Sequence, residues 1–533
     1  MKRVICEGAG SERTFMSGVL TLSLSTVIVK IIGLVYKIPL LSVLGAEGMG
    51  YFNSAYEIYA LLCGISTSGL PIAVSMLISS ARETGDYARV GRVFRTSSAL
   101  LITKGVLVSC GLAVFAAPVA RAVGNTDAYL AILAISPALL FSCISGAVRG
   151  YFQGCRNMAP TAVCQLLEAV GKLIFGVAFA VLAVFMGMSV PTAAAFAVLG
   201  VSVGSMTAAV FLVIRKKVEA RNSSLTSGGE HKSGHCFWDL LKISLPITVS
   251  SALMGSSRII DMAFIMRRLD DIGVSSFDAN VIYGSYTTLA MPIYSLVPAF
   301  IPPITESLIP RLSAAVGTGA AEEQSRAVTN SVRLTVFLAI PASMGIALYS
   351  EQILRILFGE QSEAINIAAP LLSVLGASVV FSCLITTTTA ILQSYRCVIY
   401  PILSLAAGAV VKAVSAYVLI GNADIGTMGA PISTLLFNAT VLAFNLGFMY
   451  KRIPKGASVL KQLPKPFFAA IVAMVLSYGA YLPMTRVTNK DTLSFGVALL
   501  VAVAVYFALA VLFGVVGKDD IAVLGHSKKH NGE

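Results

Sequence analysis

Charged residues are scarce in this sequence. Asp, Glu, Lys and Arg together make up 12% of the 533 residues, whereas hydrophobic residues make up 56%. A soluble globular protein carries about 25% charged residues, so this scarcity excludes a water-soluble enzyme and a disordered chain. The sequence instead predicts an integral membrane protein.

Motifs for soluble catalysis and for metal binding are also missing. The sequence has no GxxxxGK[ST] phosphate-binding loop and no HExxH pair. Its nine cysteines and four histidines form no CxxC pair and no Cys/His cluster with metal-site spacing. One GxSxG string at 200–204 lies inside an apolar run, so we interpret Ser202 as helix packing rather than as a nucleophile. We expect no enzyme, no metal and no cofactor, and the missing phosphate-binding loop argues against a self-contained ATP-driven pump.

Long apolar runs recur from one end of the chain to the other. A membrane-spanning helix needs about 20 mainly apolar residues, and the runs predict an all-α polytopic membrane protein with about fourteen such helices. The predicted spans are 15–44, 51–80, 93–117, 126–148, 158–186, 189–214, 240–264, 282–312, 329–350, 364–392, 399–420, 426–450, 465–485 and 492–516.

The basic residues are distributed unevenly among the loops. The net charge is +13, which in a soluble protein would suggest nucleic acid as a partner. Here Lys and Arg concentrate in both termini and in the loops after even-numbered spans. The loops after odd-numbered spans hold only Arg121, Arg267, Arg268, Arg355, Arg486 and Lys490. Basic residues favour cytoplasmic loops, so we predict both termini in the cytoplasm of a multi-pass cell-membrane protein, and no nucleic-acid partner.

The two halves of the chain resemble each other. FSCISGAVRGYFQGCR at 141–156 matches FSCLITTTTAILQSYR at 381–396 at a constant offset of 240 residues, and VKII at 29–32 parallels SRII at 257–260. Six helices separate equivalent positions, so the halves are predicted to be parallel repeats forming two six-helix lobes around a central cavity. The predicted domains are an N-lobe at 1–220, a cytoplasmic linker at 221–239, a C-lobe at 240–455 and two further helices with a cytoplasmic tail at 456–533.

Several charged residues lie deep within the predicted spans, where ionisable groups cost about 2.5–3.5 kcal/mol each and mark functional sites. The deep set comprises Lys30, Lys37, Lys172, Arg258, Lys412, Glu168 and Asp261. The i,i+3 spacing predicts an Arg258–Asp261 pair, and the i,i+4 spacing predicts a Glu168–Lys172 pair. Glu57 and Lys104 either snorkel to the interface or take part in function.

The deep set holds more cations than anions, which predicts a cavity for an anionic substrate. We therefore predict a substrate-binding set of Lys30, Lys37, Arg258, Asp261, Lys172 and Lys412. Glu168 and Glu57 are candidates for ion coupling; for Glu168 a structural ion pair is the alternative.

Four stretches carry a family resemblance: 26–59, SGLPIAVSMLIS at 68–79, RGYFQGCRNMAPTAVCQLLEAVGKLIFG at 149–176 and SRIIDMAFIMRRL at 257–269. They resemble the stage V sporulation protein B and polysaccharide-transport branch of the multidrug/oligosaccharidyl-lipid/polysaccharide (MOP) exporter superfamily. The resemblance covers roughly residues 15–515.

This resemblance implies a flippase for undecaprenyl-pyrophosphate-linked glycans, such as lipid II or a related cell-wall or polysaccharide precursor, working by alternating access. It implies the lipid-linked oligosaccharide, membrane lipids and cell-wall synthesis proteins as partners, with a role in peptidoglycan biosynthesis or sporulation. A drug or organic-cation antiporter of the same superfamily is the alternative.

The sequence departs from the distantly similar MurJ-type lipid II flippases, which hold cavity arginines in helices 1, 2 and 8. Lys30 takes the place of the first arginine, but Tyr36, Cys63–Gly64 and Tyr286 stand where the others would be. Lys37 and Arg258 are the residues that could supply the missing charge.

Overall fold

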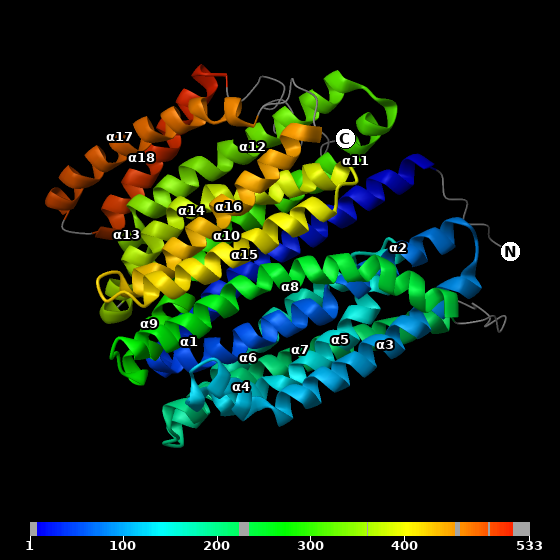
Figure 1. Ribbon diagram of the computed structural model, residues 1–533, viewed down its shortest axis with the longest axis horizontal. Coiled ribbons are helices and arrows are strands. Elements are labelled where there is room, and N and C mark those ends of the chain that lie inside the picture. The colour runs from blue at the N-terminus through cyan, green and yellow to red at the C-terminus, as the bar shows by residue number, and fades with distance from the viewer. Residues whose placement is uncertain (1–7, 223–233, 360, 453–458, 489–490, 515–533) are drawn as a thin grey trace. The chain divides into compact units, whose positions relative to one another are not determined.

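The computed structural model describes residues 8–222, 234–359, 361–452, 459–488 and 491–514, and the described part of the chain contains helices but no strands (Figure 1). Twelve helices in this part are long and apolar enough to cross a membrane. The main helices are α1 Gly8–Thr67, α2 Gly69–Glu83, α3 Tyr87–Val114, α4 Ala116–Ala122, α5 Tyr129–Gly154, α6 Ala159–Phe185, α7 Val190–Asn222, α8 Gly234–Asp271, α9 Ser276–Ser285, α10 Met291–Leu296, α11 Pro302–Thr318, α12 Ala321–Leu348, α13 Ser350–Phe358, α14 Ser362–Ser394, α15 Ile399–Ile420, α16 Gly429–Arg452, α17 Pro464–Thr488 and α18 Asp491–Leu512.

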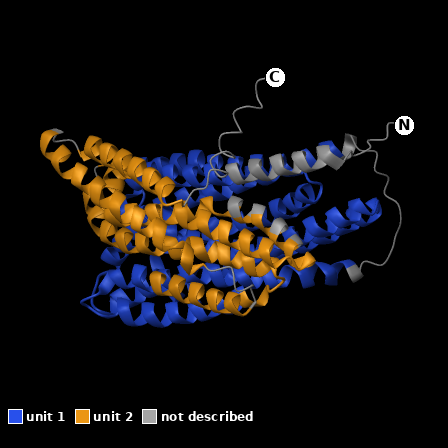
Figure 2. Ribbon diagram, turned by 90° about the horizontal axis from the view of Figure 1, so that it is seen from above, with its two compact units in different colours: residues 1–292, 401–433 blue, residues 293–400, 434–533 orange. Residues whose placement is uncertain are grey.

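The chain divides into two compact units (Figure 2). Unit 1 comprises Met1–Pro292 and Pro401–Ser433, and unit 2 comprises Ile293–Tyr400 and Thr434–Glu533. In unit 1, α8 and α9 pack against α1, so these helices group with the first seven. The predicted division into lobes at 1–220 and 240–455 describes the repeat rather than these units, and it stays a prediction. Of the predicted linker, 223–233 lie outside the described residues and α8 already begins at Gly234.

α1 contains a reversal of the chain rather than one straight helix. Lys37 and Asn53 are 16 residues apart, a spacing that would separate them by about 24 Å along a continuous helix. Their side-chain atoms Nζ and Oδ1 nevertheless lie 3.5 Å apart. The turn falls at Gly45, whose φ of 69° and ψ of 175° belong to a region open essentially to glycine alone. The predicted span 15–44 therefore corresponds to the first arm of this hairpin, and the predicted span 51–80 to the second arm followed by α2.

The predicted span 282–312 is interrupted several times. α9 runs into a π-helical turn at Tyr286–Ala290, followed by α10, a 3₁₀ turn at Val297–Phe300 and α11. The border between the two units falls inside this broken segment, after Pro292. Because of these interruptions and the merged α1 hairpin, the predicted count of fourteen spans is not confirmed.

The internal repeat is visible in backbone geometry. Arg156 and Arg396, which stand at the offset of 240, are the non-glycine residues with positive φ in the described part of the chain, both at 59°. Each follows a long helix, α5 or α14. The amide of Arg156 donates to the carbonyl of Gln153, and the amide of Arg396 donates to that of Gln393. The matching sequence segments therefore fold into the same helix end.

Candidate functional site

Most of the predicted site residues meet in unit 1, in what we call the polar network: Lys30, Lys37, Asn53, Glu57, Arg258, Asp261, Tyr286, Thr287, Thr288 and Lys412. They come from the two arms of α1, from α8, from the π-turn after α9 and from α15. α1 and α9 approach closely because Gly284 has no side chain, and a Cβ there would overlap the carbonyl oxygen of Ala46.

Asp261 forms a buried ion pair with Lys412. Its Oδ2 accepts a hydrogen bond from Lys412 Nζ at 2.8 Å, and the exposed fractions of the two side chains are 3% and 1%. The hydroxyl of Tyr286 lies 3.5 Å from the same oxygen. This pair joins α8 to α15 within unit 1.

The predicted Arg258–Asp261 pair is wrong. Arg258 instead pairs with Glu57 of the second arm of α1, at 3.3 Å from Nη1 to Oε2. Successive residues on a helix turn by about 100°, so residues three apart point in directions that differ by about 60°. Asp261 contacts α15, whereas Arg258 contacts α1. Glu57 is therefore the ion-pair partner of Arg258 in the network.

Lys30 and Lys37 lie on the first arm of α1. Both are close enough to Arg258 for mutual electrostatic repulsion. Lys30 is exposed on the surface of the chain, whereas Lys37 is half-buried and donates to the carbonyl of Thr287 at 2.6 Å. The carboxylates Glu57 and Asp261 balance Arg258 and Lys412, so the two lysines of α1 supply the positive excess of the network.

A second cluster lies between α5, α6 and α7, still within unit 1. Glu168 Oε2 accepts from Arg149 Nη2 at 3.2 Å, and its Oε1 lies 3.4 Å from the hydroxyl of Ser205. Lys172 Nζ lies 5.8 Å from the centre of the Tyr56 ring, a cation–π arrangement. The predicted Glu168–Lys172 pair is therefore replaced by Arg149–Glu168, because a side chain from a neighbouring helix reaches Glu168.

The site residues that the sequence analysis missed include Arg149 and Asn53, as well as Thr287 and Thr288 of the π-turn. Arg149 was placed in a loop after the span 126–148, but α5 continues to Gly154 and keeps Arg149 inside the helix. The RGYFQG motif at 149–154 was the available signal. Asn53 is 1% exposed and donates to Thr288 Oγ1 at 2.8 Å; a buried asparagine in an apolar run was its only sign.

Lys104 is bound to a backbone carbonyl in the structure. Rather than snorkelling freely, its ammonium donates to the carbonyl of Ile65 at 2.8 Å, close to the bend between α1 and α2. It lies outside the polar network.

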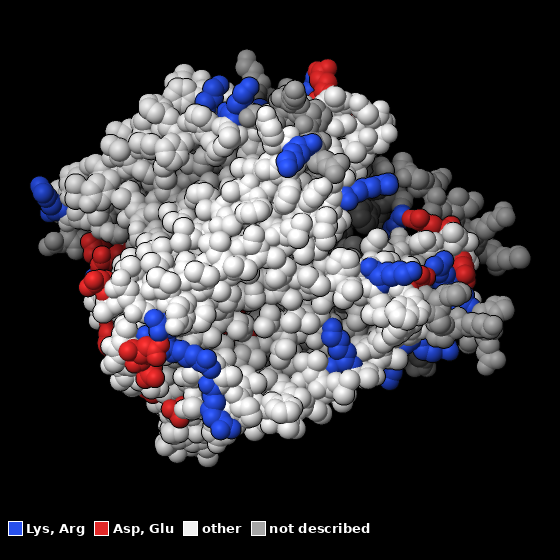
Figure 3. All heavy atoms as spheres, viewed as in Figure 1, with Lys and Arg blue, Asp and Glu red and all other residues white. Residues whose placement is uncertain are grey.

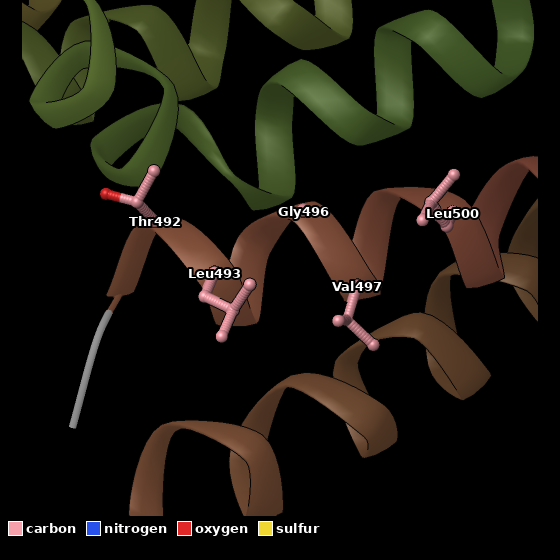
Figure 4. A pocket seen from close by; sticks show the side chains of 5 residues that line it. All are labelled: Thr492, Leu493, Gly496, Val497 and Leu500. Carbon is pink, nitrogen blue, oxygen red and sulfur yellow. The ribbon is translucent and has the colours of Figure 1, made fainter. Parts of the chain in front are cut away.

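An apolar groove of about 570 Å³ in unit 2 is separate from these residues. It is lined by Thr492, Leu493, Gly496, Val497 and Leu500 of α18 (Figure 4). Its lining carries no ionisable side chain, so it offers no group that could bind an anion.

The surface matches that of a membrane protein. In Figure 3 the surface over the middle of the helices is mostly uncharged, and charged side chains gather toward the helix ends. Together with the buried ion pairs, the long apolar helices define a multi-pass membrane protein with a charged site inside its helical part.

The comparisons with known proteins give the family. The family model for "Polysaccharide biosynthesis protein" matches residues 15–316, and a second model, MatE, matches residues 246–418. The chain belongs to the polysaccharide biosynthesis protein family.

Two curated relatives come from Bacillus subtilis (strain 168). Stage V sporulation protein B is 25% identical over 96% of this chain and 98% of its own length. Lipid II flippase MurJ is 28% identical over 83% of this chain and 84% of its own.

Solved structures show the same fold. A lipid II flippase MurJ in an inward closed conformation gives a TM-score of 0.68 at 15% identity, covering 93% of this chain and 98% of that one. An inward-facing MATE family transporter of the MOP superfamily gives 0.66 at 15% identity, covering 81% and 98%. The predicted resemblance and the all-α polytopic membrane fold are confirmed, and so is the prediction that the chain is a transporter-type protein rather than an enzyme.

Proposed function

We propose that this protein flips an undecaprenyl-pyrophosphate-linked glycan, lipid II or a related cell-wall or polysaccharide precursor, across the cytoplasmic membrane by alternating access. Two relatives that match most of this chain, named as a lipid II flippase and a stage V sporulation protein, support the class of substrate. The drug or organic-cation antiporter is the alternative, and the MATE structures support it only through the shared fold.

The observation that carries the proposal is the unbalanced positive charge at Lys30 and Lys37. Arg258 and Lys412 each have a carboxylate within 3.3 Å and 2.8 Å respectively, whereas Lys37 contacts a neutral carbonyl and Lys30 is exposed. A diphosphate placed beside them would form charge-assisted hydrogen bonds, which are about twice as strong as neutral ones.

The predicted substrate-binding residues take different roles in this proposal. Lys30, Lys37 and Arg258 contact the pyrophosphate, while Asp261 and Lys412 hold α8 against α15 behind them. Lys172 is a more distant contact, and Glu168 and Glu57 orient Arg149 and Arg258. Membrane lipids and cell-wall synthesis proteins complete the proposed partners.

We further propose that both termini are cytoplasmic. The facing ends of α2 and α3 are rich in arginine, with Arg82, Arg89, Arg92 and Arg95. At the opposite end of these helices (Figure 1), the facing ends of α8 and α9 carry Asp270, Asp271 and Asp278, which outnumber Arg267 and Arg268. Basic loops stay in the cytoplasm.

The test is replacement of a lipid II flippase in cells depleted of their own, with translocated precursor measured directly. We expect the wild-type chain to restore translocation and Lys30→Ala with Arg258→Ala to abolish it at unchanged membrane abundance. Lys30→Arg should be milder than Lys30→Glu, because the diphosphate needs positive charge. Lys104→Met, which removes an intramembrane lysine outside the network, is the control. Full activity of the double alanine variant, or export of organic cations without precursor translocation, would contradict the proposal.

A further inference from the structure

The π-turn at Tyr286–Ala290 is held at three consecutive residues by three different parts of the polar network. The hydroxyl of Tyr286 lies 3.5 Å from Asp261, the carbonyl of Thr287 accepts from Lys37 at 2.6 Å, and the hydroxyl of Thr288 accepts from Asn53 at 2.8 Å. Asn53 also lies 3.5 Å from Lys37. π-turns inside α-helices are rare and occur often at functional sites.

In the π register, the carbonyl of Thr287 faces a position that cannot donate a backbone hydrogen bond. In the π register each carbonyl accepts from the amide five residues later, and the amide of Met291 does donate to the carbonyl of Tyr286. For Thr287 the corresponding residue is Pro292, which has no N–H. Lys37, from the first arm of α1, supplies the missing hydrogen bond.

We propose that Lys37 is a displaceable latch on this turn. Without substrate, its ammonium caps the Thr287 carbonyl and fixes the π-turn. When a polyprenyl pyrophosphate binds at Lys30 and Arg258, the Lys37 ammonium donates to a phosphate oxygen instead of to the Thr287 carbonyl. The π-turn then loses this hydrogen bond and is released. This step rests on the proposed function, whereas the latch in the empty protein does not.

The chemistry favours this exchange of partners. A phosphate oxygen carries negative charge and forms a stronger hydrogen bond with an ammonium than a neutral carbonyl does. Lys37 interacts electrostatically with both Glu57 and Arg258, so an anion that binds beside Arg258 also attracts Lys37. The released segment continues directly into Ile293, the first residue of unit 2, so a change in the turn is transmitted along the chain from one unit to the other.

The latch can be tested by hydrogen–deuterium exchange of the full-length protein in lipid nanodiscs, read in the peptide covering residues 286–291. Lys37→Met should accelerate exchange there by about tenfold, because a hydrogen bond to a charged donor is lost. Thr288→Val, which removes only the acceptor for Asn53, should have a smaller effect in the same direction. Lys104→Met removes another lysine–carbonyl bond and should leave this peptide unchanged.

A second-site variant separates the latch from general loosening. Pro292→Ala restores a backbone N–H at the position that should donate to Thr287. The double variant K37M/P292A should therefore return exchange toward the wild-type rate. Unchanged exchange in Lys37→Met, or a double variant as fast as Lys37→Met alone, would overturn the latch.

The exchange of partners is tested with undecaprenyl pyrophosphate as the probe. Binding is established first from a thermal shift of the wild-type protein. We expect the probe to accelerate exchange at 286–291 in the wild type and to add nothing in Lys37→Met. Binding without faster exchange would overturn the release step. No binding to the wild type would contradict the proposed function instead. In either case, the comparison of variants without ligand tests whether Lys37 holds the turn.

Discussion

At the scale of single residues, the charges inside the helical part divide into those that neutralise each other and those that do not. Asp261 and Lys412 are nearly inaccessible and form an ion pair across two helices. Arg149 and Glu168 also pair, but their side chains are 23% and 20% exposed. These two pairs should therefore respond differently to the removal of one partner.

Asp261→Asn should destabilise the protein by about 3–5 kcal/mol, because it removes the carboxylate that pairs with the buried Lys412 ammonium. The double variant D261N/K412M should recover much of that loss, since no buried charge remains. Thermal unfolding in detergent should be measured for the wild type, both single variants and the double variant. These four proteins form a complete double-mutant cycle. Additive losses would show that the two residues are not coupled.

Glu168→Gln should cost less stability than Asp261→Asn, because the Arg149–Glu168 pair is partly exposed and its interaction is screened. Thermal unfolding measures the loss, and the dependence of transport on an imposed ion gradient is measured on the same preparation. If Glu168 is structural, the gradient dependence should remain. A stable Glu168→Gln variant that has lost gradient-driven transport would assign the residue to ion coupling instead.

At the scale of elements, breaks in helices place the site. The reversal at Gly45 brings Lys37 next to Asn53, and the π-turn after α9 presents a carbonyl to Lys37. Gly45 lies at the first break, and Pro292 lies two residues after the end of the second. Uninterrupted helices would have separated these groups.

Gly45→Ala should destabilise the protein by about 1–3 kcal/mol, because a Cβ is strained at this φ and ψ. Gly33, also on α1, is the matched control: it is helical and an added Cβ would meet nothing within 4 Å. Gly33→Ala should therefore be neutral or stabilising by up to about 1 kcal/mol. Thermal unfolding compares the two, and equal effects would contradict the assignment of the turn to Gly45.

At the scale of the whole molecule, the distribution of charge along the helices predicts an orientation in the membrane. The arginine-rich facing ends of α2 and α3 and the described loop after α4 lie at opposite ends of α3. The positive-inside rule assigns the first to the cytoplasm.

Cysteines introduced in a background without accessible native thiols test this orientation. Ala122→Cys and Glu351→Cys should react with a membrane-impermeant maleimide in intact cells. Thr84→Cys and Lys217→Cys should react only after the membrane is permeabilised. Labelling of Lys217→Cys in intact cells would reverse the predicted topology.

The sequence by itself determined the class of fold and most members of the site. Long apolar runs predicted membrane-spanning helices, because polar groups are costly to expose to lipid. The offset of 240 residues predicted the repeat, and Arg156 and Arg396 at this offset have the same positive φ. Charged residues such as Lys37 and Asp261 could be recognised as site candidates because an ionisable group inside an apolar run costs free energy unless it has a partner or a function.

Only the tertiary structure decided which charges meet. Spacing along one helix shows that two side chains can touch, but a third side chain from another helix competes for the same partner. Asp261 pairs with Lys412 rather than with Arg258, and Glu168 pairs with Arg149 rather than with Lys172. Lys37 donates to a carbonyl 250 residues away, because a backbone group freed by Pro292 has to be satisfied by whatever donor the fold brings beside it.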